Sequence, residues 1–218
     1  MKVSIHQPNF LPWLGLFDKI KNSDLFIVLD DVQFSHTEFQ ARNKIRVPDG
    51  FTWITVPVDA KNKPLNETRA MISDEWVKET IKKLDRSYSS KKLGQREFFK
   101  YNLIRWLKRT DLDLADYNQR ILKALCEAGS IQTPFVRSSE LGEPGSGSDR
   151  IFNLCYAVGA DVYLSGAGGR NYLHLQDFKR NGIKVEFQDF KHPVYEQTFP
   201  GFETNLSAID KLFCTGTI

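Results

Sequence analysis

The sequence has few cysteines, no long apolar run and little excess charge. Its three cysteines, Cys126, Cys155 and Cys214, lie far apart without a CxxC pair, which argues against a disulfide framework or zinc ribbon and indicates a reducing compartment. No apolar stretch approaches the ~20 residues that span a bilayer, and Met1-Lys2 runs directly into an expected strand without a signal-peptide pattern. The net charge of +3 is far from that of a dedicated nucleic-acid binder, although it permits an anionic ligand. We therefore expect a cytoplasmic protein without a membrane span.

Several widespread catalytic motifs are also missing. The chain contains no G-x-S-x-G elbow and no Ser-His-Asp order. Its glycine-rich stretch, residues 165–169, lacks the lysine and threonine of a P-loop and the full dinucleotide fingerprint. The acidic pair Asp30-Asp31 has weak metal-ligand spacing, so we predict no metal site, and no solenoid-type repeat is present.

The N-terminal region organises the rest of the chain. An alternating strand at residues 2–5 is followed by a polar loop, a helix over 13–21 and a nearly pure apolar strand over 25–29. Strand, loop, helix and buried strand are typical of a parallel βαβ unit. In such units, ligands bind outside the carboxyl ends of the strands. That is where the sequence places His6-Gln7 and Asp30-Asp31.

The remaining pattern predicts an α/β fold, an open and mostly parallel sheet flanked by helices, in a single domain over residues 1–218. We expect strands at 43–47 and 51–58, which form either a hairpin or two neighbouring strands, and an inserted helical block at about 74–129. That block comprises helices at 74–92, 95–109 and 116–128, and its basic residues indicate a solvated face or a docking surface: Lys78, Lys82, Lys83, Arg86, Lys91, Lys92, Arg96 and Lys100. Downstream we expect strands at 135–136, 160–165 and 183–188, and helices at 150–159, 175–181 and within 202–213.

Three residues are candidates for catalysis. His6 ends a buried strand, where an imidazole can act as a general base or bind an anion; the alternative is a histidine that only stabilises a turn. Asp30 can orient a sugar hydroxyl or act as a base, and the alternative is a carboxylate that caps the following turn. His192 follows the last strand and is the candidate for a second acid or base, with a plain loop histidine as the alternative.

The glycine-rich stretch is the candidate anion site. Ser165, Gly166, Gly168 and Gly169 follow a strand and expose several backbone N–H groups at the start of a helix. Such an arrangement suits a phosphate or carboxylate.

Five stretches together resemble the WbqC-like protein family: residues 5–15 (IHQPNFLPWLG), 29–34 (LDDVQF), Arg42-Asn43, 163–172 (YLSGAGGRNY) and 187–197 (FQDFKHPVYEQ). The resemblance covers about residues 3–214. It implies a bacterial setting in O-antigen or capsule biosynthesis and an enzyme that transfers an acyl or aminoacyl group to an amino sugar. The residues expected to bind substrate are Gln7, Asn9, Trp13, Asp31, Gln33, Arg42, Asn43, Ser165, Gly166, Gly168, Gly169, Tyr172, Tyr195 and Gln197.

A fainter resemblance connects the first βαβ unit with HUP-type nucleotidyltransferases, whose HxGH motif grips nucleotide phosphates. Here the corresponding residues are 13–16 (WLGL), and both histidines are missing. The resemblance implies a shared fold and puts adenylyl transfer by the usual residues in doubt.

Three functions therefore stand as alternatives. The first is a transferase that uses His6 as base, with an activated acyl donor and a nucleotide-linked or lipid-linked sugar as acceptor; no cofactor is implied. The second is a nucleotide-binding or nucleotidyl-transferring protein. The third is a non-catalytic partner in a biosynthetic complex, and a form of it uses the basic helical block to receive an aminoacyl-transfer RNA donor.

Overall fold

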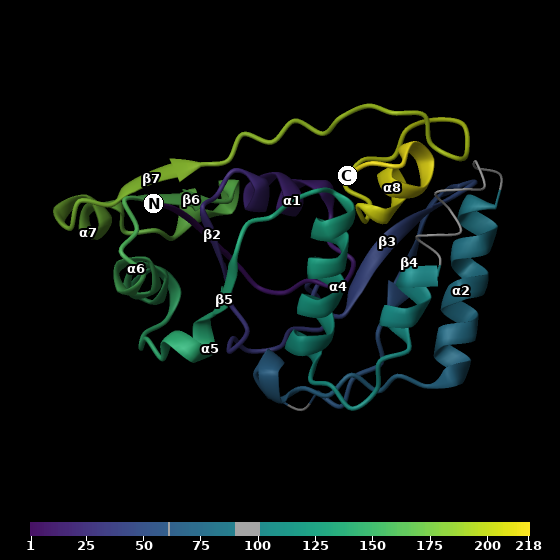
Figure 1. The fold of residues 1–218 in the computed structure, drawn as a ribbon, viewed down its shortest axis with the longest axis horizontal. Helices are drawn as coiled ribbons and strands as arrows, with labels where there is room; N and C mark the ends of the chain where they lie inside the picture. Colours follow the sequence, from purple (N-terminus) through teal and green to yellow (C-terminus); the bar gives the residue numbers. More distant parts are fainter. Residues whose placement is uncertain (61, 90–100) are drawn as a thin grey trace. The chain divides into compact units, whose positions relative to one another are not determined.

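The computed structural model describes residues 1–60, 62–89 and 101–218 (Figure 1). The chain forms two compact units, and each unit collects segments that are distant in the sequence. Unit 1 comprises Met1–Gln7, Gly15–Val32 and Ile131–Lys191, whereas unit 2 comprises Pro8–Leu14, Gln33–Ser130 and His192–Ile218. The single domain expected over residues 1–218 stays a prediction.

Unit 1 contains a five-stranded sheet in the order β5-β2-β1-β6-β7. Every neighbouring pair of strands is parallel, so the predicted α/β class with an open parallel sheet flanked by helices is confirmed. The elements in chain order are β1 (Lys2–His6), α1 (Leu14–Lys21), β2 (Leu25–Val28), β5 (Phe135–Arg137), α5 (Ser138–Leu141), α6 (Gly147–Ala157), β6 (Val162–Ser165), the 3-10 helix η2 (Ala167–Asn171), α7 (Leu175–Arg180) and β7 (Lys184–Phe187).

The order of the strands shows that the sheet is doubly wound. The chain proceeds from β1 outward through β2 to β5, and it then returns to the other side of β1 to form β6 and β7. The direction of winding therefore reverses between β1 and β6, which is the topological switch point of the sheet. This order is compatible with a HUP-like fold, which stays a suggestion.

Side-chain alternation along β1 assigns helices to the two faces of the sheet. Val3 and Ile5 belong to a buried apolar cluster with side chains of α6 and α7 such as Leu154 and Phe178. Ser4 lies between them and faces the opposite side, where the hydroxyl of Ser23, just after α1, donates to Ser4 Oγ at 2.8 Å. The α6–α7 face thus carries an apolar core, and α1 covers the other face.

Unit 2 contains an antiparallel hairpin and a set of helices. Its elements are β3 (Arg42–Val47), β4 (Gly50–Thr55), the 3-10 helix η1 (Leu65–Glu67), α2 (Asp74–Tyr88), helical residues 101–107, α4 (Leu114–Ala128) and α8 (Ile209–Thr215). The hairpin is confirmed, with Arg42 opposite Thr55 and Val47 opposite Gly50. Residues 95–100 of the expected helix over 95–109 lie outside the described residues, as do Lys91, Lys92, Arg96 and Lys100 of the basic block. Lys78, Lys82, Lys83 and Arg86 are exposed, as a solvated face requires.

Side-chain caps account for the starts of the long helices in unit 2. Ser73 Oγ accepts a hydrogen bond from Trp76 N at 3.1 Å, and the Asp113 carboxylate accepts one from Asp116 N at 2.7 Å. Each such cap contributes about 1 kcal/mol of helix stability. The expected start of α2 after Ser73 is therefore confirmed.

The C-terminal helix expected within residues 202–213 begins at Ile209 and continues to Thr215. The backbone before it makes extended contacts: Ser207 forms a bridge with Trp13 and donates to Lys44 O at 2.9 Å. The short helix α5 was not expected, since four residues carry no readable period. It is closed by Gly142, whose φ of 65° is the left-handed conformation that glycine adopts easily.

Candidate active site

Three neighbouring strands of unit 1 deliver the main candidate residues to one edge of the sheet. His6 ends β1 opposite Val28 of β2, and Asp30 follows two residues after Val28. Ser165 ends β6 on the other side of β1. Because the strands are parallel, their carboxyl ends share an edge, so His6, the acidic pair and the glycine loop all follow strands at that edge.

The position of His6 coincides with the switch point of the sheet. Beyond this point in open α/β sheets, the loops of two adjacent strands diverge and ligands bind between them. Here the two strands are β1, which ends in His6, and β6, which ends in Ser165 and continues into Gly166. The histidine and the glycine loop therefore flank the place where this class of fold binds ligands.

The local contacts of His6 define its proton state. The ring is half-buried, and its Nδ1 lies 2.8 Å from the carbonyl oxygen of Gln7. A carbonyl can only accept, so Nδ1 carries the proton and Nε2 carries the lone pair. Burial, with a smaller effect from the positive charge of Lys19, lowers the pKa of His6 to about 4. The imidazole is therefore neutral near pH 7 and can accept a proton or hydrogen bond at Nε2.

Asp30 is held by the start of α5. Its carboxylate is fully buried; Oδ1 accepts from Ser138 Oγ and Ser139 N, each at 3.0 Å, and Oδ2 accepts from Ser139 Oγ at 2.7 Å. The guanidinium of Arg137 lies 3.6 Å from Oδ2. These contacts cap the start of the distant helix α5 and join β2 to it, whereas the structural alternative expected from the sequence was a cap on the turn directly after β2. The catalytic role of Asp30 stays a prediction.

Asp31 faces a different set of partners. Its Oδ1 lies 2.6 Å from the same Ser138 Oγ, whose single proton the two acids share, and its carboxylate forms an ion pair with Arg150 of α6. Asp31 and Arg150 are partly buried, so this pair is more strongly held than a fully exposed one. The acidic pair thus links β2 to α5 and α6, and its link to substrate stays a prediction.

The glycine loop owes its tight course to one glycine in particular. A Cβ atom on Gly169 would lie 2.0 Å from Ser165 Oγ and 2.9 Å from Leu173 Cδ1, so only glycine fits there. A Cβ on Gly166 or Gly168 would have no atom within 4 Å. Gly166 and Gly168 therefore have free space beside their Cα atoms, whereas Gly169 packs against Ser165 at the end of β6. Tyr172, the next candidate, exposes 48% of its surface at the end of this loop.

In unit 2, two buried asparagines, one of them a candidate from the sequence, support the loop at residues 8–14. Asn43 is buried and donates to the carbonyls of Phe10 and Leu11 at 3.1 and 2.8 Å, where Leu11 adopts a φ of 43°. Asn118 of α4, which sequence reasoning missed, donates to Pro8 O and Gln40 O, both at 2.7 Å. An asparagine on the apolar stripe of an amphipathic helix was the available signal for it.

The other candidates from this half of the chain occupy varied positions. Asn9 is buried, and Trp13 forms a bridge with Ser207. Gln33 is exposed and donates to Lys63 O at 3.1 Å. Arg42 donates to Thr37 O at 2.8 Å, and its guanidinium carbon lies 4.5 Å from the centre of the Trp53 ring. Substrate contacts by these residues stay predictions.

Tyr195 and Gln197 converge on a buried acid that sequence reasoning missed, Asp210. The Tyr195 hydroxyl and Gln197 Nε2 donate to Asp210 Oδ2 at 2.8 and 3.0 Å, and the Tyr88 hydroxyl donates to Oδ1 at 3.0 Å. Burial raises the pKa of the Asp210 carboxyl and also that of the Tyr195 hydroxyl. An aspartate among the apolar residues of the C-terminal helix was the only signal for this network.

His192 belongs to unit 2 and lies in an aromatic setting. Its ring stacks on Tyr195 with centroids 6.2 Å apart and meets Phe202 edge to face at 5.7 Å. Its Nδ1 lies 2.9 Å from Pro193 O. A catalytic role for His192 stays a prediction.

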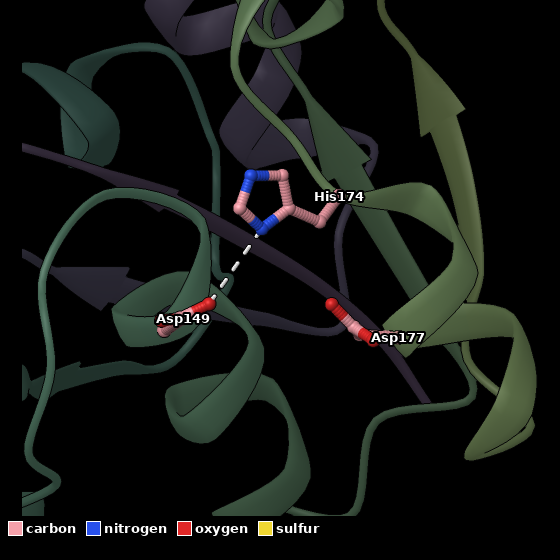
Figure 2. A group of neighbouring side chains, drawn as sticks. All are labelled: Asp149, His174 and Asp177. Atoms are coloured by element: carbon pink, nitrogen blue, oxygen red, sulfur yellow. Dashed lines mark ion pairs between the residues drawn. The ribbon is translucent and has the colours of Figure 1, made fainter.

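One group of side chains within the described ranges could hold a cation (Figure 2). Figure 2 shows Asp149 and Asp177 on either side of His174, with the His174 Nδ1 3.7 Å from Asp149 Oδ1. Asp149 and His174 are exposed, and Asp177 is also paired with Arg180 at 3.7 Å. This surface group shares no residue with the carboxyl-edge site.

The helices of residues 1–60, 62–89 and 101–218 include none with the length and hydrophobicity needed to cross a bilayer.

Comparison with known proteins identifies the family. The sequence profile of the WbqC-like protein family matches residues 7–218. The uncharacterized protein Rv1507c of Mycobacterium tuberculosis is 32% identical over 218 residues, which cover 99% of this chain and 94% of that protein. No solved structure matches the chain. The chain belongs to the WbqC-like protein family.

Proposed function

We propose that this protein is a cytoplasmic transferase that adds an acyl or aminoacyl group to an amino sugar during O-antigen or capsule biosynthesis. The observation that carries the proposal is His6, a neutral imidazole with its Nε2 lone pair available at the switch point of a parallel sheet. The resemblance to surface-polysaccharide proteins supplies the setting. The acceptor is an amino sugar linked to a nucleotide or a lipid.

The reaction begins with attack of the sugar amine on the carbonyl carbon of an activated donor, an ester or thioester. A carbon–nitrogen bond forms, and the nitrogen of the tetrahedral intermediate carries a positive charge. His6 Nε2 takes one proton from this nitrogen as general base. The bond between carbon and the leaving oxygen or sulfur then breaks, and His6 returns the proton to the leaving group.

A pKa of about 4 makes His6 a weak base before attack. It suits a proton transfer that follows attack, because a nitrogen bonded to the former carbonyl carbon is far more acidic than a free ammonium. The same low pKa keeps His6 unprotonated throughout the physiological pH range. We therefore expect protonation of His6 to limit activity only in acid, near pH 4.

The test compares His6→Ala with His174→Ala, which removes an exposed histidine of the same unit. Each protein is incubated with nucleotide-linked amino sugars and either acyl-CoA or aminoacyl-transfer RNA, and products are measured by mass spectrometry. We expect His6→Ala to lower kcat/KM by between about 100-fold and 10,000-fold, and His174→Ala to leave it within about twofold. Circular dichroism confirms that both variants fold. Undiminished turnover by His6→Ala refutes the proposal.

A second candidate function has support from topology. The strand order places two diverging loops beside β1 and β6, as in mononucleotide-binding sheets, so nucleotidyl transfer is the alternative. Release of pyrophosphate from a nucleoside triphosphate, dependent on His6, would favour it. Absence of that release together with acyl transfer would favour the first proposal.

A further inference from the structure

Lys19 is a buried cation that the proposed reaction leaves unused. It lies on α1 with 3% of its surface exposed, and its ammonium nitrogen donates to Ile5 O at 2.8 Å. No carboxylate in the described ranges forms an ion pair with it, and the bond to Ile5 uses one of its three N–H donors. The neighbouring Asp18 carboxylate is taken by the side-chain amides of Gln188 and Asn22, at 2.6 and 3.1 Å.

The carbonyl that Lys19 contacts can be assigned to one side of β1. In a parallel ladder, the carbonyls of successive residues point alternately to the two neighbouring strands. His6 O accepts from Leu29 N, on the β2 side, whereas Met1 O accepts from Val162 N at the start of β6. Ile5, an odd-numbered residue like Met1, therefore points its carbonyl towards β6.

The pairing of β1 with β6 ends before this carbonyl is reached. The register between β1 and β2 continues to His6, but the register between β1 and β6 stops at Ser4 opposite Leu164. Beyond that rung, Ile5 O has no partner from β6, and the Lys19 ammonium takes the place of the missing donor. The positive charge thus lies in the gap between β1 and β6, which is the switch point, beside His6.

Among residues 1–60, 62–89 and 101–218, no side chain around Lys19 supplies a balancing negative charge. Burial lowers the pKa of Lys19 to about 8, so it is still about nine-tenths protonated at pH 7. His6 is neutral, and burial raises the pKa of the Cys155 thiol to about 12, so the thiol is neutral too. A buried charge without a counter-charge is unfavourable, and such groups mark binding sites more often than chance.

We propose that the Lys19 ammonium is an anion subsite that binds a phosphate group of the substrate beside His6. Two of its N–H donors are available, and a phosphate supplies the missing negative charge as well as acceptor oxygens. Gly166 and Gly168, across the gap, leave open space at their Cα atoms and so allow close approach of a ligand. The inference rests on the proposed function in sharing one site with His6, and it narrows the acceptor to a phosphate-bearing sugar.

The test measures binding of inorganic pyrophosphate to the full chain by calorimetry. Lys19→Met keeps the length of the side chain and removes its charge, and Lys21→Met removes an exposed lysine of the same helix. We expect Lys19→Met to weaken binding by at least about tenfold, and Lys21→Met to change it by less than about twofold. Equal binding by Lys19→Met and the wild type overturns the proposal, as does absence of binding by the wild type.

A second measurement uses only the wild-type protein, so it holds even where Lys19→Met fails to fold. The chain has four histidines, whose ring signals can be followed by nuclear magnetic resonance. Pyrophosphate bound at Lys19 should shift the signal of His6 and raise its pKa above 4, while exposed His36 and His174 stay unchanged. An unmoved His6 signal at saturating pyrophosphate overturns the proposal.

These results are independent of the test of function. Pyrophosphate binding that depends on Lys19, together with full transfer activity in His6→Ala, would leave the subsite intact and remove the proposed role of His6. Loss of activity in His6→Ala, together with pyrophosphate binding that is the same in Lys19→Met and the wild type, would support the proposed role of His6 and remove the Lys19 subsite.

Discussion

The depressed pKa of His6 predicts that the protein loses stability in mild acid. The folded-state pKa is about 4, whereas the ordinary value for a histidine in an unfolded chain is 6.5. Between these values the unfolded state binds a proton that the folded state does not, so the free energy of unfolding falls as the pH falls. The contribution of neutral His6 to the free energy of unfolding is complete above pH 6.5, declines between pH 6.5 and pH 4, and changes no further below pH 4.

The magnitude follows from the difference between the two pKa values. A difference of roughly 2.5 pH units corresponds to about 3 kcal/mol in full, since each unit is worth about 1.4 kcal/mol. At pH 4.5 most of this has been lost, roughly 2–3 kcal/mol. The value is an upper bound, because the ring is only half-buried and water screens part of the effect.

The assay is urea unfolding followed by tryptophan fluorescence at pH 8 and pH 4.5. We compare the wild type with His6→Gln, which cannot titrate, and with His174→Gln, which removes an exposed histidine. The loss of stability in acid should be smaller in His6→Gln by roughly 2–3 kcal/mol, and unchanged in His174→Gln. An identical pH dependence in the wild type and His6→Gln would show that His6 has an ordinary pKa, and the reasoning about its neutral form would fail.

Two further predictions concern packing. Gly169→Ala should lower the free energy of unfolding by about 1–3 kcal/mol, because its Cβ would meet Ser165 Oγ at 2.0 Å, whereas Gly168→Ala should change it by less than about 0.5 kcal/mol. Adding Ser165→Ala to Gly169→Ala should recover part of the lost stability. Equal stability of Gly169→Ala and Gly168→Ala in urea unfolding would contradict the close packing of Gly169. Asn118→Ala should cost about 1–3 kcal/mol in the same assay, because it leaves Pro8 O and Gln40 O without their buried donor. Arg120→Ala, exposed on the same helix, is the control, and a similar cost for both would argue against this role of Asn118.

Periodicity predicted most of the sheet because its signals are local. Val3 and Ile5 alternate with polar residues, and residues 25–29 form one apolar run, so the parallel βαβ unit could be predicted from the sequence. Loops that follow parallel strands must start at one edge. The gathering of His6, Asp30 and Gly166 at that edge followed directly from the strand assignments.

The partners of the candidate side chains could not be predicted in the same way. Asp30 accepts hydrogen bonds from Ser138 and Ser139, which are more than 100 positions away, and Asp210 accepts one from Tyr88 across 122 positions. Such contacts depend on how distant segments pack, and composition does not encode them. The role of Lys19 was hidden for a similar reason: a lysine near the end of an amphipathic helix is usually exposed, and only the early end of the β1–β6 ladder gives this one a buried acceptor.

The division into two units had no signal along the chain. The loop at residues 8–14 belongs to unit 2, although it connects two elements of unit 1. Its assignment depends on buried donors such as Asn43 and Asn118, which come from later segments. A reader of the sequence sees one continuous βαβ unit with a polar loop.

The central claim is that His6 is the base in transfer of an acyl or aminoacyl group to an amino sugar. The most direct measurement is mass spectrometry of the surface polysaccharide from a strain that lacks this protein, complemented with the wild type or with His6→Ala. We predict that the wild type restores an acylated or aminoacylated amino sugar and that His6→Ala yields the same polymer with a free amine. A polymer from the His6→Ala strain that carries the full acyl content would contradict the account.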